Sequence, residues 1–91
     1  MQDIIELIET GENVSPDTIF KCFQEIGEIG DIMIFKIDAG RDENQYTIVI
    51  SSPDMSFESI RYDASTIEES LLKALKKYTS IKGAHCSIVA N

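Results

Sequence analysis

The chain has 91 residues, 43% of them hydrophobic, and its 16 Asp and Glu against 8 Lys and Arg give a net charge of −8. This length predicts one domain, and the apolar content excludes a disordered acidic tail. Nucleic-acid phosphates and anionic lipids repel such a chain, so we expect it to bind neither directly, whereas basic protein surfaces attract it.

Two helices are predicted in the N-terminal third of the chain. Apolar residues at positions 4, 5, 7 and 8, with acids between them, indicate a short helix over about residues 2–10, ended by the glycine that follows. Ser15 and Pro16 form a helix start, with a hydroxyl N-cap and proline at the first helical position. Apolar residues at helical spacing follow, and we expect Gly27 and Gly30 to end this second helix.

Three strands are predicted next. Residues 31–38 are a nearly continuous apolar run, which is typical of a central strand. After a polar turn at 39–44, residues 46–50 are rich in β-branched side chains and form the second strand. Pro53 ends this strand because proline cannot donate to a sheet ladder, and residues 57–62 alternate in polarity as a third strand.

The C-terminal part is predicted to hold the longest helix and a last strand. Ser65-Thr66-Ile67-Glu68 matches a capping box, in which Ser65 caps the helix and Glu68 returns a hydrogen bond. Glutamates early in this helix and lysines late in it complement the helix dipole. Lys82-Gly83 is expected to turn the chain into a strand at 84–90.

These elements predict a single α+β domain over residues 1–91, in the order ααβββαβ. Residues 1–30 supply two helices and residues 31–91 supply a βββαβ core. A four-stranded, mostly antiparallel sheet with helices packed on one face buries both kinds of apolar stripe. No stretch approaches the roughly 20 apolar residues of a membrane helix, and the acidic N-terminus does not match a signal peptide, so we expect a cytoplasmic protein.

The sequence contains no catalytic or metal-binding pattern. His85, the single histidine, is expected to alternate with Cys86 along the last strand, so the two cannot form a thiolate–imidazolium pair. Cys22 and Cys86 are expected to be small buried hydrophobic residues. The acids around the turn at 39–44 do not have the spacing of a calcium loop. We therefore expect no enzyme activity, no cofactor and no metal.

The acids of the N-terminal third are the candidate binding site. Residues 1–31 contain eight acids and one Lys, whereas residues 70–91 contain four Lys and no acid. Spaced carboxylates can imitate a row of phosphates and steer association with a basic groove; the alternative is a solubilising surface. The partner-binding candidates are Glu6, Glu9, Glu25, Glu28 and Asp31, followed by the hairpin acids Asp42 and Glu43.

A hairpin with a polar tip is followed by Ser52-Pro53-Asp54, a third strand, and the helix start Asp63-Ala64-Ser65-Thr66-Ile67-Glu68-Glu69-Ser70-Leu71. In this order, residues 34–78 resemble HicB-type antitoxins. The resemblance implies a βββαβ fold that binds and neutralises a small ribonuclease toxin. Two departures are that Met55-Ser56-Phe57 replaces the family's Pro-Gly-Cys-like turn, and that residues 1–30 have no counterpart.

The leading hypothesis is a small acidic, non-catalytic binding protein that inhibits a nucleic-acid-directed partner by occluding its basic surface as a nucleic-acid mimic. An antitoxin, an immunity protein and a phage-encoded anti-defence protein, such as an anti-CRISPR, all fit. The alternative is a self-associating assembly module, with the third or the last strand as a free edge and Phe57, Ile60 and Tyr62 available for pairing. A homodimer is compatible with both hypotheses.

Overall fold

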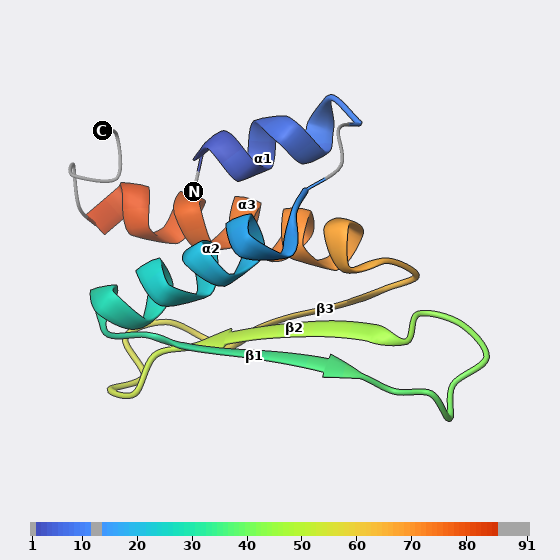
Figure 1. Cartoon of the computed structure of the whole chain (residues 1–91). Coiled ribbons are helices and arrows are strands. Elements are labelled where there is room, and N and C mark those ends of the chain that lie inside the picture. Colours follow the sequence, from blue (N-terminus) through green and yellow to red (C-terminus); the bar gives the residue numbers. More distant parts are fainter. Residues whose placement is uncertain (1, 12–13, 86–91) are drawn as a thin grey trace.

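The computed structural model describes residues 2–11 and 14–85, and these form three layers (Figure 1). The helices are α1 (Gln2–Glu9), α2 (Pro16–Ile29) and α3 (Ile67–His85). The strands are β1 (Ile32–Ile37), β2 (Tyr46–Ser51) and β3 (Ile60–Ala64), which pair antiparallel in the order β1-β2-β3. α2 and α3 cover one face of the sheet and α1 lies on top of them, which confirms the α+β class and the one-sided packing.

The predicted fourth strand is not found among the described residues, whose order is ααβββα. α3 continues to His85, so the turn expected at Lys82-Gly83 and the strand start expected at 84 are wrong, while residues 86–90 lie outside the described part of the chain. A glycine within a helix costs only about 1 kcal/mol, which tertiary contacts can offset. The contact of Lys82 with Asp31, described below, is one of these. His85 therefore ends a helix rather than alternating along a strand.

Among the described residues, β1 is an edge strand and not the central strand that its apolar run predicted. The central strand is β2, whose Ile48 and Ile50 are fully buried beneath the helices. Ile32 and Ile34 of β1 are 45% and 51% exposed, on the face of the sheet that no described helix covers. The run is continuous because one of its faces packs against the core while the other stays apolar and open.

Two other element boundaries differ from the sequence prediction. β3 begins at Ile60 rather than 57, because the residues after β2 form a turn in which the Ser56 amide donates to Ser52 Oγ at 3.2 Å. Phe57 thus leaves the sheet and packs edge-on against Tyr78, with ring centres 6.1 Å apart. α2 passes through Gly27 and ends at Gly30, whose φ of 106° gives the left-handed cap.

The core lies between the sheet and the two inner helices. From α3, Leu71, Leu75 and Tyr78 are fully buried. Ile26 of α2 meets them from the neighbouring helix, and Cys22 is buried as predicted. No helix in the described ranges is long and apolar enough to cross a membrane.

Hydroxyl side chains cap the starts of α2 and α3. Ser15 Oγ accepts a hydrogen bond from the Thr18 amide at 3.2 Å, as predicted. At α3 the cap is Thr66 and not Ser65, since the Glu69 amide donates to Thr66 Oγ1 at 3.1 Å. Ser65 Oγ instead donates to Asn44 Oδ1 at 3.3 Å, so the N-cap lies one residue later than predicted.

The substitution Thr66→Ala should lower the free energy of unfolding by about 1 kcal/mol, because it leaves an amide of the first turn of α3 without its acceptor. Ser65→Ala is the matched control and should change that free energy by less than about 0.5 kcal/mol. Urea denaturation of both variants measures the difference. A larger loss of unfolding free energy in Ser65→Ala than in Thr66→Ala would identify Ser65 as the N-cap.

Candidate functional site

Four of the predicted binding residues lie at the C-terminal ends of α1 and α2. Glu6 and Glu9 lie in the last turn of α1, Glu28 lies in the last turn of α2, and Glu25 directly precedes that turn. Neither last turn holds a basic residue. The C-terminus of a helix carries partial negative charge, so acids there oppose helix stability. α3 follows the favourable rule, with two glutamates in its first turn.

The four glutamates form two acidic ends rather than one cluster. α1 and α2 run in opposite directions (Figure 1), so the end of α1 lies near the start of α2. Glu28 lies about 18 Å further along α2, at 1.5 Å per residue. All four glutamates are exposed, and Glu9 forms an ion pair with Lys76 of α3 at 2.8 Å.

Asp31 does not belong to an exposed acidic surface, contrary to the prediction. Its side chain is 5% exposed, and its carboxylate accepts a hydrogen bond from Tyr78 Oη at 2.6 Å. Lys82 Nζ lies 2.8 Å from the same carboxylate oxygen and 5.5 Å from the ring centre of Phe57. This group, the Asp31 cluster, ties the start of β1 to α3; Asp31 and Tyr78 are buried in it, and Lys82 and Phe57 are partly buried.

Two buried side chains have raised pKa values. Burial, together with the hydrogen bond to Asp31, raises the pKa of Tyr78 well above its ordinary value, so its hydroxyl stays protonated. Burial raises the pKa of the Cys22 thiol to about 11. At neutral pH this thiol is protonated and enclosed, which makes it a core residue and a poor nucleophile.

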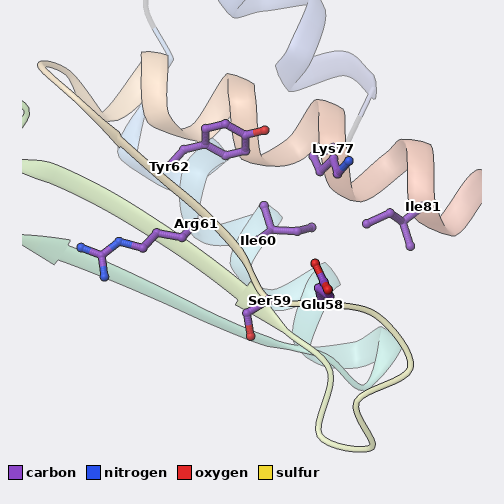
Figure 2. A pocket seen from close by; sticks show the side chains of 7 residues that line it. All are labelled: Glu58, Ser59, Ile60, Arg61, Tyr62, Lys77 and Ile81. Atoms are coloured by element: carbon purple, nitrogen blue, oxygen red, sulfur yellow. The ribbon is translucent and has the colours of Figure 1, made fainter.

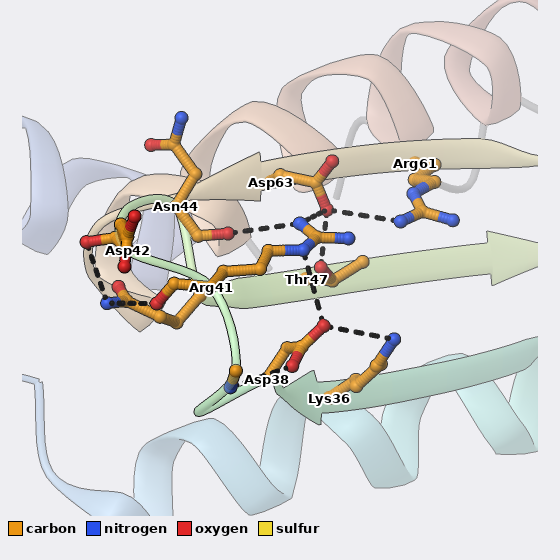
Figure 3. Close-up of polar contacts among 10 residues, drawn as sticks. Lys36, Asp38, Arg41, Asp42, Asn44, Thr47, Arg61 and Asp63 are labelled. Carbon is orange, nitrogen blue, oxygen red and sulfur yellow. Dashed lines mark hydrogen bonds and ion pairs between the residues drawn. The ribbon is translucent and has the colours of Figure 1, made fainter.

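The open face of the sheet carries a network of charged residues around Arg41 (Figure 3). Arg41 Nε lies 3.3 Å from Asp38 Oδ2, and Arg41 Nη1 lies 3.4 Å from Asp63 Oδ1. Asp63 also accepts a hydrogen bond from the Thr47 hydroxyl, and this bond, with Arg61 and Arg41 nearby, lowers the pKa of Asp63. The network holds the β1–β2 loop against the sheet and keeps one excess positive charge, because Lys36, Arg41 and Arg61 face two acids, Asp38 and Asp63.

The two hairpin acids, Asp42 and Glu43, are exposed in the loop between β1 and β2. The loop is held in place by Arg41, whose Nη1 donates to the Asn44 carbonyl at 3.2 Å, and by Gln45, whose amide donates to the Asp42 carbonyl at 3.3 Å. Both carboxylates therefore project from an ordered turn, apart from the four helix glutamates.

A hollow of about 390 Å³ lies between the edge strand β3 and α3 (Figure 2). Its charged groups are dispersed, and Arg61 extends along the sheet away from Lys77. Ile60 is 4% exposed and Phe57 lies outside β3, so two of the three residues predicted for edge pairing are not available there. The lining residues are Glu58, Ser59, Ile60, Arg61, Tyr62, Lys77 and Ile81. In the described part of the chain, no group of three or more His, Cys, Asp or Glu could hold a metal ion.

The substitution Asp31→Ala should lower the free energy of unfolding by about 2–3 kcal/mol, because it leaves the Tyr78 hydroxyl buried without an acceptor and Lys82 without its counter-charge. Glu28→Ala removes an exposed acid nearby and should change it by less than about 0.5 kcal/mol. Denaturant titration compares the two variants. Equal effects would mean that Asp31 has no structural role.

Stability should fall as the pH rises above about 10, the ordinary pKa of tyrosine. The unfolded chain then loses the Tyr78 proton while the folded chain keeps it, so the unfolded state is favoured. Tyr78→Phe should lack this part of the decline. Unfolding free energies measured across alkaline pH provide the test, and parallel curves for both proteins would contradict it.

Comparisons with protein families, with curated proteins and with solved structures found no match to this chain.

Proposed function

We propose that this chain is a small, non-catalytic binding protein that inhibits a nucleic-acid-directed partner by covering the partner's basic surface. The placement of Glu6, Glu9, Glu25 and Glu28 at the negative ends of α1 and α2 carries this proposal. Acids in these places oppose the dipoles of their own helices, so helix stability does not account for them, although Glu9 also pairs with Lys76. Residues that break a local rule without a structural gain are typical of functional surfaces.

The pairing of the basic side chains supports the same proposal. Most basic side chains of the described residues are occupied by ion pairs with acids, one of which is Glu9. Such surface pairs add little stability, but they reduce the positive charge that a partner meets. Six of the eight Lys and Arg form ion pairs with acids between described residues: Lys36, Arg41, Arg61, Lys73, Lys76 and Lys82.

The spacing of the acids suits a groove that otherwise holds nucleic acid. The distance from the start of α2 to Glu28, about 18 Å, equals the axial length taken up by about five phosphates on one strand of a duplex. Carboxylates at both ends of this span would engage basic side chains on the partner, and long-range attraction would speed the encounter. The resemblance to HicB-type antitoxins favours a toxic nuclease as the partner; immunity and anti-defence roles use the same chemistry.

The test begins with tagged protein, used to capture partners from a nuclease-treated lysate of the source cells at low and high salt. Glu28→Lys should weaken the captured partner's affinity about tenfold or more, because each reversal replaces an attraction with a repulsion. The same variant should raise the free energy of unfolding by a few tenths of a kcal/mol, since lysine suits a helix C-terminus.

Glu58→Lys is the matched control, because it makes the same charge change at an exposed position in the β2–β3 loop. Its effect on partner affinity should stay within about twofold, which corresponds to about 0.4 kcal/mol. If both substitutions weakened binding equally, the acidic ends would act only through the net charge of the chain and would not be the binding site. A captured partner without a basic nucleic-acid surface would overturn the proposal.

A further inference from the structure

In the described part of the chain (residues 2–11 and 14–85), β1 is an edge of the sheet, and it lacks the features that usually protect one. Its register with β2 runs unbroken from Ile32 to Ile37, and it contains no proline and a single charge, Lys36. Edge strands of monomeric proteins usually carry charges, proline or bulges that prevent pairing with another strand. β3, at the opposite edge, has Arg61 and Asp63 within five residues. The two edges of this sheet therefore differ in their capacity to pair.

Exposed apolar side chains gather around the same edge. Ile32 and Ile34 of β1 lie on the open face of the sheet. On the other side lie Ile37 of β1 and Ile29 at the end of α2, which packs on β1 (Figure 1). Both sides of the edge are thus apolar, which is unusual for a surface left in water. Four of the six exposed large hydrophobic residues in the described chain therefore belong to β1 or to the end of α2 directly before it: Ile29, Ile32, Ile34 and Ile37.

The backbone of β1 is oriented to receive another strand. The Asp38 amide donates to the Gln45 carbonyl at 2.8 Å, in register with the β1–β2 ladder. Peptide groups alternate in direction along a strand, so even-numbered residues of β1 face β2. Those of Met33, Phe35 and Ile37 consequently face outward at the edge.

We propose that β1 pairs with β1 of a second copy of this chain, antiparallel about a two-fold axis at Ile34. Met33 then exchanges backbone hydrogen bonds with Phe35 of the second copy, and Ile34 lies opposite Ile34 of the second copy. Ile32 faces Lys36 of the second copy, and no like charges meet. Moving the axis to Phe35 would bring the two copies of Lys36 to diagonal positions, which disfavours that register.

The charge of the edge favours a second copy over a basic partner. A basic partner would meet Lys36 and, on the same open face, the Arg41 network, whereas a second copy presents the same apolar strip. The strip is only about 20 Å long, so it buries less than the roughly 800 Å² per partner of a standard interface, and we expect a weak dimer with a dissociation constant of about 10 μM. The net charge of −8 on each copy opposes pairing, and salt screens that repulsion.

Disulfide trapping tests the predicted register. Residues directly opposed in a non-hydrogen-bonded antiparallel pair have Cα atoms about 4.5 Å apart, which a disulfide can span. Ile34→Cys, in a Cys86→Ser background, should therefore form a covalent dimer under mild oxidation. Arg61→Cys is the control, exposed at the opposite edge of the same sheet, and should give at most about one fifth of the yield, a difference of about 1 kcal/mol. Equal yields would overturn the register.

Sedimentation of the unmodified chain tests the dimer itself. The dimer fraction should rise with concentration and with salt, and Ile34→Lys should weaken it about tenfold or more, whereas the control Met55→Lys, an exposed apolar residue away from β1, should leave it unchanged. A monomer at every concentration, or equal effects of both variants, would overturn the proposal. The inference does not rest on the proposed function. The two are also distinguishable in the experiment, because partner binding should weaken as salt rises, whereas dimerisation should strengthen.

Discussion

The hydrogen bond from Tyr78 to the buried carboxylate of Asp31 is the interaction on which the arrangement of the molecule depends. Asp31 lies between α2 and β1, and Tyr78 lies in the second half of α3, so this one contact fixes two inner helices and a strand relative to one another. Lys82 compensates the buried charge. An isolated charge in this place would be strongly unfavourable, so the cluster persists only as a complete set.

The fixed arrangement of α2, α3 and β1 leaves two exposed surfaces of different chemistry. α2 is held with its acidic end pointing outward near the start of β1, and β1 is left as an apolar edge. The first surface acts at long range and weakens in salt, whereas the second acts only on contact and gains from salt. A dimer through β1 would carry two sets of acidic ends, so the two surfaces can operate together without competing for residues.

The features that the sequence predicted correctly depend on neighbouring residues. Ser15 and Pro16 start α2 and Gly30 ends it, because capping needs only groups within one turn. The prediction that Ser65 caps α3 is wrong because the neighbouring Thr66 matches the capping pattern equally well. Ser65 instead donates a hydrogen bond to Asn44, which is distant in sequence. The hairpin and the apolar face of α3 were likewise predictable from turn residues and periodicity.

The errors concern properties that depend on distant parts of the chain. An apolar run does not reveal whether a strand lies at the centre or the edge of a sheet, so β1 was misplaced. Asp31 was grouped with the surface acids because its partners lie 47 and 51 residues away. The candidate site was predictable as far as Glu6, Glu9, Glu25 and Glu28, whereas their separation into two ends needed the directions of the helices. The measurement that tests the central claim most directly is a competition titration, in which the captured partner's nucleic acid is challenged with increasing amounts of this chain. Mutually exclusive binding, with displacement weakening as salt rises, is the predicted result; a stable complex of chain, partner and nucleic acid together would contradict it.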